Sequence, residues 1–259
     1  MPSRSRSVGL LALLSSAAAM TPTAAIAQDA AANAVADSLV PLRIISAEAL
    51  ETVAGSPRLL TALAQVVPAL VEQAFGSGLA GHTLQATLRG LSPNDVLVLV
   101  NGKRRHLTAN VGAHPGGGPH QPDAGVDFDF IALDAIERID ILTDGAAARY
   151  GSDAIAGVIN IVLKKRSSGL AIGGIYGGHF EGGSTADASG NAGFAPTDGG
   201  TVNATAEVRH EGDTPRDGDS PRGAIDPGGT PYELQIFALN AGFDVGNGGQ
   251  LYAFGTYGT

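Results

Sequence analysis

The segment that decides the fold is Asp144-Gly-Ala-Ala-Ala-Arg-Tyr-Gly-Ser-Asp-Ala-Ile-Ala-Gly-Val-Ile-Asn-Ile-Val-Leu-Lys164. Its first half consists mostly of small residues and glycines, which favour a tight connection because glycine accepts backbone angles that other residues avoid. An apolar run follows from Val158 to Leu163, and such a run next to turn residues predicts a buried strand. Two lysines, Lys164 and Lys165, end the strand. The segment therefore predicts a glycine-punctuated turn that leads into the interior of a folded domain.

A second segment upstream reads Leu88-Arg-Gly-Leu-Ser-Pro-Asn-Asp-Val-Leu-Val-Leu-Val-Asn-Gly-Lys-Arg-Arg105. Its apolar strand is closed by Asn-Gly, the strongest short hairpin signal. The two segments, in this order and at this distance, resemble the plug domain of TonB-dependent outer-membrane receptors, and the resemblance is strongest from Pro41 to Lys165. It implies an α+β plug domain over residues 41–166, a small mixed sheet with short helices, followed by the start of an antiparallel transmembrane β-barrel.

The local patterns in residues 41–166 agree with a mixture of short strands and short helices. Ser46 is suited to be the N-cap of a helix, because its hydroxyl can accept a hydrogen bond from the first turn. No G-x-G-x-x-G turn joins a strand to a long helix, so a doubly wound nucleotide fold is not predicted. The expected strands are Leu42–Ile45, Thr83–Arg89, Val96–Val100, Arg138–Leu142 and Val158–Leu163, and the expected helical segments are Ser46–Glu51, Pro57–Val67 and Ile131–Ile136.

Residues 167–259 contain an internal repeat, because Asn191-Ala-Gly-Phe194 recurs as Asn240-Ala-Gly-Phe243 and a glycine-rich turn follows each copy. After the first turn, apolar and polar residues alternate from Thr201 to His210, as a transmembrane barrel strand requires. A soluble β-sandwich would show the same alternation. We expect five barrel strands: Leu170–Glu181, Thr185–Ala195, Thr201–Glu211, Tyr232–Asp244 and Gln250–Thr259.

The barrel is expected to be incomplete. Receptors of the resembled family close with about 22 strands, and five strands cannot close. An open edge in lipid would leave backbone groups without hydrogen bonds. We therefore expect the chain to be a truncated, N-terminal part of a longer receptor that is not competent for transport as it stands.

The N-terminus predicts export. Arg4 and Arg6 precede a short apolar run, Val8–Met20, and Ala25-Ile-Ala27 forms a cleavage site before Gln28. These features together indicate a signal peptide over residues 1–27, whereas a buried apolar helix would need none of them. Residues 28–40 are alanine-rich, and we expect them to be flexible.

The resemblance implies TonB, with its inner-membrane energising complex, as a partner of the segment before the plug domain. A receptor of this kind carries a short apolar box near its mature N-terminus that pairs with TonB as an added strand. The candidate here is Val35-Ala-Asp-Ser-Leu-Val40, with Val35, Asp37, Leu39 and Val40 as contact residues. It runs directly into the first plug strand, so the box is either degenerate or fused with that strand.

Two arginines are expected to lock the plug. Arg89 lies in Leu88-Arg-Gly90 and Arg149 in Ala148-Arg-Tyr-Gly151. The resemblance implies that both pair with barrel glutamates beyond Thr259. A guanidinium suits this role because it binds carboxylates bidentately and stays charged. The alternative is a pair of solvated surface arginines.

The segment from His106 to Phe130 is rich in His, Pro, Gly and Asp. Its spacing matches no zinc or calcium pattern, so no metal site is predicted. The resemblance implies apical loops that contact a ligand, with a plain solvated loop as the alternative. The candidate ligand-contact residues are His106, His114, His120 and Asp123.

Composition narrows the function further. The chain has no cysteine, so it cannot rely on disulfides after export. A net charge of −9 argues against a nucleic-acid partner. No spacing pairs a nucleophile with a base, so neither catalytic residues nor a cofactor are predicted.

We predict a TonB-dependent receptor in the outer membrane of a Gram-negative bacterium, surrounded by lipid. It would take up a scarce small ligand such as a metal chelate, cobalamin or an oligosaccharide. The alternatives are a secreted or surface β-rich binding protein and a periplasmic hydrolase.

Overall fold

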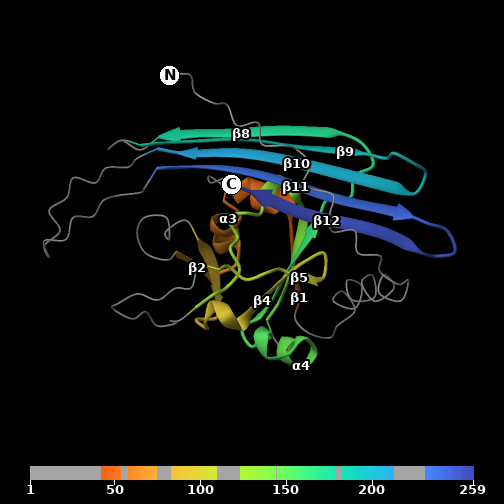
Figure 1. Cartoon of the computed structure of the whole chain (residues 1–259). Helices are drawn as coiled ribbons and strands as arrows, with labels where there is room; N and C mark the ends of the chain where they lie inside the picture. The colour runs from red at the N-terminus through yellow and green to blue at the C-terminus, as the bar shows by residue number, and fades with distance from the viewer. Residues whose placement is uncertain are drawn as a thin grey trace, which may run out of the picture.

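A mixed α/β unit and a broad antiparallel sheet lie against each other in the computed structural model, which describes residues 42–53, 58–74, 83–109, 123–143, 145–178, 183–212 and 231–259. Figure 1 shows a mixed α/β unit, the expected plug domain, beneath a broad antiparallel sheet built from the C-terminal third of the chain. We call that second sheet, β8–β12, the wall. The signal segment, residues 28–40 and the TonB-contact candidates Val35, Asp37, Leu39 and Val40 lie outside the described residues.

The plug domain is organised around a five-stranded mixed sheet with the order β1-β6-β7-β4-β5. Strands β4 and β7 run parallel, with Val98 opposite Ile159, and the other neighbours are antiparallel. The parallel pair is buried on both faces, as the largely apolar sequence of its two strands requires. The strands are β1 Leu42–Ser46, β4 Val96–Val100, β5 Lys103–Arg104, β6 Ile136–Leu142 and β7 Gly157–Leu163.

Short helices and a separate hairpin complete the plug domain. Ser46 Oγ accepts a hydrogen bond from the Ala49 amide at 3.3 Å, which confirms the predicted cap. The helical segments are α2 Ala47–Val53, α3 Leu59–Val66, α4 Ala146–Tyr150, and the 3-10 turns η2 Pro93–Asp95, η3 Leu133–Ala135 and η4 Ser152–Ala154. The two-stranded sheet consists of β2 Leu70–Ala74 and β3 Leu84–Leu88.

The wall is a meander with the order β12-β11-β10-β9-β8, in which every neighbouring pair is antiparallel. Glycines occupy the left-handed region at its tight turns, where other residues are strained: Gly199 has φ 80° and Gly246 has φ 79°. The strands are β8 Leu170–Gly178, β9 Ser184–Phe194, β10 Gly200–Glu211, β11 Tyr232–Asp244 and β12 Gln250–Gly258.

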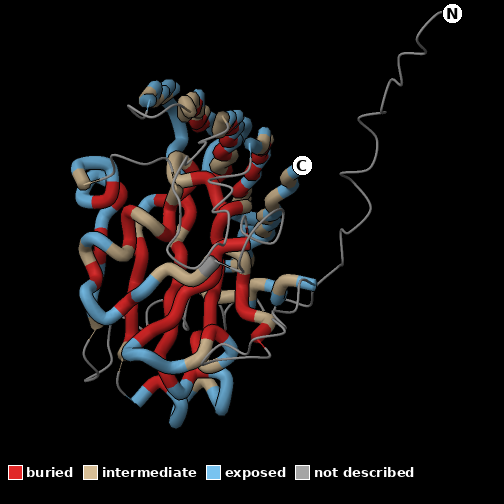
Figure 2. Tube along the Cα trace, turned by 90° about the vertical axis from the view of Figure 1, so that its left-hand side faces the viewer, coloured by how far each residue is buried: buried red, intermediate tan, exposed pale blue. Residues whose placement is uncertain are grey.

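The two faces of the wall differ in chemistry. The predicted alternation in β10 is confirmed: Glu207 and Arg209 are 2% and 1% exposed on the plug side, while Val208 between them is 44% exposed. On β11, Ile236 is buried and Phe237 is half-exposed. Figure 2 shows buried residues concentrated in the strands of the plug domain, and buried and exposed residues alternating along the wall. The plug therefore faces the side of the wall that carries its buried charged residues, together with Leu234 and Ile236 of β11, and an apolar surface faces outward.

Most predicted elements are present. The wall strands agree with the predicted ranges to within one residue, except that β8 ends at Gly178, and β4 and β11 match in full. Sequence patterns did not predict β2, α4 or the 3-10 turns η2 and η4, and they gave no range for β5. Helix α4 has only five residues and is rich in alanine, with no repeated apolar face to signal it. None of the helices in the described ranges has the length and apolar character that a bilayer-spanning helix needs.

Candidate functional site

The candidate site is the seam, the contact between the plug domain and the plug-facing side of the wall. Its centre is Arg209 on β10, whose side chain is only 1% exposed. Arg209 Nη1 donates to Asp129 Oδ1 of the plug at 2.5 Å, and Nη2 donates to Glu207 on its own strand. Arg209 Nε lies 3.6 Å from Asp187 Oδ2 on the neighbouring strand β9. One buried guanidinium is thus surrounded by three buried carboxylates.

This geometry makes Arg209 an attachment point. A guanidinium has a planar fork of donors that can bind several carboxylate oxygens at once. Burying a charge is costly unless it is paired, so removing one member leaves the others uncompensated. Because Asp129 belongs to the plug and Arg209 to the wall, separating the two domains would break this ion pair.

A second ion pair crosses the seam with the opposite polarity. Arg58, which precedes α3 of the plug, donates to Glu211 Oε2 at the end of β10 at 2.8 Å. The same guanidinium donates to the Tyr232 hydroxyl on β11 and lies 5.4 Å from the centre of that ring. Burial opposes the charge of Arg58, but Asp129, Tyr232 and Glu211 outweigh it and raise the pKa of Arg58. The plug is therefore attached to the wall by one arginine from each side.

Neutral hydrogen bonds extend the seam along the strands. Asn240 on β11 accepts from Asn101 Nδ2 at 3.1 Å and donates to the carbonyl of Lys164 at 2.9 Å. Asn203 on β10 makes a reciprocal pair with the backbone of Arg166, at 2.9 and 3.2 Å. These asparagines set the register between wall strands and plug backbone.

Asp127 organises the loop that carries Asp129. Its Oδ1 accepts hydrogen bonds from the amides of Leu84 at 3.2 Å and Asp129 at 3.0 Å. Burial raises the pKa of Asp127 to about 6, although these two amides and nearby Arg105 favour the charged form. Arg105 in turn donates to Thr256 Oγ1 on β12 at 2.7 Å.

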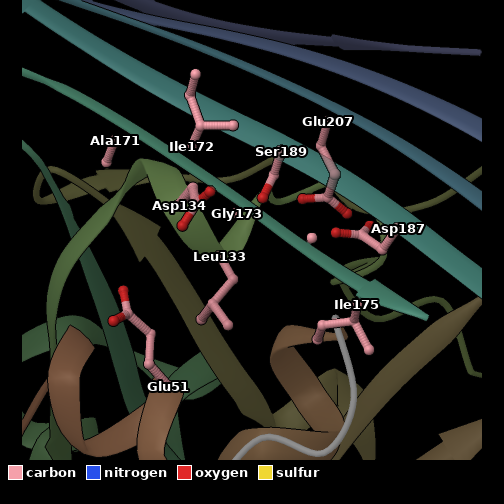
Figure 3. Close-up of a pocket in the computed structure, with 11 residues that line it drawn as sticks. Glu51, Leu133, Asp134, Ala171, Ile172, Gly173, Ile175, Asp187, Ser189 and Glu207 are labelled. Atoms are coloured by element: carbon pink, nitrogen blue, oxygen red, sulfur yellow. The ribbon is translucent and has the colours of Figure 1, made fainter. Parts of the chain in front are cut away.

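A cavity of about 300 Å³ lies beside this cluster, between the plug and strands β8–β10. Figure 3 shows Asp134 and Glu51 reaching it from the plug, and Asp187, Glu207 and Ser189 from the wall. Two consecutive glycines, Gly173 and Gly174, line it from β8. Within the described ranges, no group of three or more His, Cys, Asp or Glu side chains is arranged to bind a metal ion.

The predicted lock residues lie away from the seam. Arg149 is exposed on α4, which Figure 1 places on the side of the plug opposite the wall, and its guanidinium lies 5.7 Å from the centre of the Tyr150 ring. Arg89 is exposed in the turn after β3 and donates to the carbonyl of Thr143 at 2.8 Å. Neither arginine is brought to β8–β12, so a pairing with later strands stays a prediction.

The predicted ligand-contact residues are separated. His106 is exposed, and partial burial together with the charge of Arg105 lowers its pKa. Asp123 is fully buried, and Gln73 Nε2 donates to it at 2.9 Å, so in this structure it is not at the surface. His114 and His120 lie outside the described residues.

Sequence reasoning did not identify the seam. The alternation in β10 correctly predicted that Glu207 and Arg209 lie on the plug side, but it does not predict which residues they contact. Asp129 lies 80 positions away from Arg209 and belongs to an irregular segment. Arg58 carried no signal, because an arginine before a short helix is usually solvated.

Comparisons with known proteins agree on one family. Residues 34–158 match the family model described as TonB-dependent Receptor Plug Domain. The ferrienterobactin receptor of Escherichia coli (strain K12) is 37% identical over 91 residues, which are 35% of this chain and 12% of that protein. The vitamin B12 transporter BtuB of Vibrio vulnificus (strain CMCP6) is 36% identical over 92 residues, which are 36% of this chain and 13% of that protein.

The fold is similar to that of solved receptors. The siderophore receptor PirA from Acinetobacter baumannii superposes with a TM-score of 0.67 at 19% identity, covering 87% of this chain and 32% of that one. The chain therefore spans about a third of the solved receptor, and at this identity the likeness concerns the fold. The superposition covers more of the chain than the family model does, so it extends beyond the plug domain.

Proposed function

We propose that the chain, whose residues 34–158 match the plug-domain family model, is part of a TonB-dependent receptor and serves active uptake through an outer membrane. The plug domain closes the barrel of which β8–β12 form the first wall. TonB pulls on the segment before β1, where Val35–Val40 is the candidate box. The protein itself catalyses no reaction in this scheme, since the energy comes from outside it.

The observation that carries this proposal is the asymmetry of the wall. Its plug-facing side buries the polar residues Glu207, Arg209 and Asn203 beside a few apolar residues of β11, while its outer side exposes apolar residues such as Ile172 and Leu239. A transmembrane barrel needs this arrangement, with lipid outside and polar groups inside. A soluble sheet that packs on one face would place its apolar side against the domain beneath it.

The ligand is proposed by class. The relatives named above are a receptor for ferrienterobactin and a transporter for vitamin B12. We propose a scarce small ligand of this kind, a metal chelate, cobalamin or an oligosaccharide, contacted by the segment that contains His106, His114 and His120. The residues that determine which of these ligand classes binds are expected in extracellular loops, where barrels of this type carry their longer connections.

The ion pairs of the seam suit a plug that must stay closed and still move. Arg58 and Arg209 attach it to the wall with charges that water can solvate once the domains separate. Arg89 and Arg149 face the other side, where we propose that later strands supply carboxylates. Replacing both by alanine in the complete receptor should raise the passive entry of large antibiotics and leave the heat-modified gel shift of the barrel unchanged.

Fractionation of the complete gene product in a Gram-negative host tests the proposal. We expect the protein in the outer membrane, with a mature N-terminus at Gln28, a gel mobility that changes on heating, and ligand uptake that stops when TonB is deleted. Matched cells expressing the Arg58→Glu variant should keep outer-membrane localisation, because β8–β12 pair through their own backbone hydrogen bonds.

Recovery of the protein from the medium or the soluble periplasm would instead support a secreted β-rich binding protein. Uptake that persists without TonB would reject the energy coupling, even for a protein that is correctly placed in the outer membrane.

A further inference from the structure

The hairpin β2–β3 forms a sheet of its own beside the main sheet of the plug domain. One face of β3 belongs to the plug core, where Leu84, Ala86 and Leu88 are buried. On the other face, Gln73 of β2 and Gln85 of β3 are directly opposite each other. The Cβ atoms of residues paired in this way are about 5 Å apart, so the two side chains are neighbours. A two-stranded hairpin is barely stable alone, so its position depends on what packs on each face.

Residues 123–130, which we call the strap, pack on this polar face of the hairpin. The Phe128 amide donates to the Leu84 carbonyl at 2.9 Å, which attaches the strap to the start of β3. The backbone of Gly125 lies directly on Gln85, because a Cβ built on Gly125 would be 2.9 Å from Gln85 Oε1. The strap and the hairpin are therefore in close contact around the Gln85 side chain.

The strap is also attached to the wall. Asp129 Oδ1 accepts a hydrogen bond from Arg209 Nη1 of β10 at 2.5 Å, in the buried ion pair of the seam. Phe130 lies against β12, since a Cβ built on Gly258 would be only 2.2 Å from its ring. Separating the strap from the wall would break a buried ion pair, which is costly. The contacts named above between the strap and the hairpin are a hydrogen bond and packing, so that side separates more easily.

Gln85 weakens the contact between the strap and the hairpin. Its side chain is 0% exposed, and neither Nε2 nor Oε1 has a hydrogen-bond partner among the described residues. Gln73 beside it has the same chemistry, but its Nε2 donates to Asp123 Oδ2 of the strap at 2.9 Å. A buried amide without partners loses its hydration and gains no hydrogen bond in return, which costs free energy. Moving the hairpin away from the strap would restore that hydration.

From this asymmetry we propose that the plug opens locally along the contact between the strap and the hairpin β2–β3, and that Gln85 determines how often it opens. The open form hydrates the Gln85 amide and keeps the Asp129–Arg209 pair, so the hairpin moves while the strap stays on the wall. The use of this opening as a passage during uptake rests on the proposed function. The opening itself is measured on the chain alone, so it stands or fails whether or not the complete receptor transports anything.

Hydrogen exchange of the full 259-residue chain in detergent micelles, followed by NMR at single amides, tests the proposal. The Phe128 amide reports on the strap, and the Ile159 amide, in the centre of the main plug sheet, reports on the plug core. We expect Phe128 to exchange at least about a hundredfold faster than Ile159. Low denaturant should leave the Phe128 rate unchanged, because a local opening exposes little surface. Equal protection of the two amides would overturn the proposal.

Matched variants test the role of Gln85. Gln85→Met keeps nearly the same volume and removes both unpartnered polar atoms, so exchange of the Phe128 amide should slow by about tenfold. Gln73→Met makes the same change on the neighbouring strand but removes the donor to Asp123, so exchange should become about tenfold faster. Arg209→Ala removes the ion pair on the wall side of the strap and should leave the exchange of Phe128 unchanged.

Faster or unchanged exchange in Gln85→Met would show that water already satisfies the buried amide, and would overturn the role of Gln85. Loss of the fold in this variant would count against that role for the same reason, and the comparison of Phe128 with Ile159 in the unsubstituted chain would still decide whether the strap and hairpin separate. Faster exchange of Phe128 in Arg209→Ala would show that the strap leaves the wall rather than the hairpin, and would overturn the proposal.

Discussion

The core of the plug domain and the seam are both buried, but they are built from opposite chemistry. The core is aliphatic: Leu50, Ile139 and Ile159 are all fully buried in one cluster. The seam combines buried charges, Arg209 with Asp129 and Glu207, with a smaller apolar contribution from the wall. Leu234 and Ile236 of β11 extend the plug core into that contact.

This difference shows that the folding of the plug and its attachment to the wall depend on different interactions. Aliphatic burial stabilises the plug without directional contacts, because it depends on the area removed from water. Buried ion pairs contribute less net stability, since each charge loses its hydration, but they specify which groups must meet. The plug can therefore fold through its own core while its position against the wall is set by charges that regain water when they separate.

The largest effect is expected at the centre of the seam. Arg209→Ala leaves Asp129, Glu207 and Asp187 buried without their shared cation. Breaking a buried ion pair from one side costs about 3–5 kcal/mol, so the free energy of unfolding in denaturant should fall by that amount. Arg104→Ala is the control, because the Arg104–Asp153 pair is more than half exposed and screened by water, so its loss should change the free energy of unfolding far less. Equal losses in the two variants would contradict the distinct role of the seam.

A somewhat smaller effect is expected in the plug core. Ile139→Ala removes a fully buried side chain from β6 and should lower the free energy of unfolding by about 3 kcal/mol, through lost transfer energy and a cavity. Ile44→Ala on the neighbouring strand β1 is the matched control, because Ile44 is 58% exposed. A truncated protein carrying residues 41–166 should respond to Ile139→Ala in the same direction. A cost confined to the longer chain would show that the plug core depends on the wall.

A change of pH is expected to have an intermediate effect on the free energy of unfolding. The pKa of Asp127 is about 6 in the folded protein and 3.8 in an unperturbed chain, so the folded state binds more protons between these values. The free energy of unfolding should then decrease as pH rises from about 4 to about 6, by about 2 kcal/mol from this group. Asp127→Asn should remove that decrease, since the amide oxygen still accepts from Leu84 and Asp129. Thermal melts across this range measure it, and an unchanged slope in the variant would contradict the assignment.

The smallest effect is expected far from the seam. Arg149→Ala on exposed helix α4 should change the free energy of unfolding of this chain by no more than about 0.5 kcal/mol, because surface substitutions are usually within that range. The same substitution combined with Arg89→Ala should weaken the attachment of the plug only in the complete receptor, where the proposed carboxylate partners are present. A large loss in the 259-residue chain would mean that Arg149 stabilises the plug itself.

Local patterns in the sequence determined much of this protein. The two plug segments, the hairpin at Asn101-Gly102 and the alternation in β10 predicted the mixed sheet and all five wall strands. Each of these signals acts over a few neighbouring residues: an apolar run, a turn pair or a period of two. They also predicted which side of β10 faces the plug, because alternation assigns successive side chains to opposite faces.

Only the tertiary structure decided which residues meet. Arg58 contacts Glu211 across 153 positions, and Arg209 contacts Asp129 across 80, so no spacing rule connects them. The predicted lock, Arg89 and Arg149, was inferred from motifs alone, and the fold places both on the side away from β8–β12. The cavity arises in the same way, since Asp134 comes from the turn η3 of the plug and Asp187 from β9 of the wall. The physical reason is that secondary structure follows from local backbone preferences and apolar periodicity, whereas ion pairs and cavities depend on how separate surfaces pack.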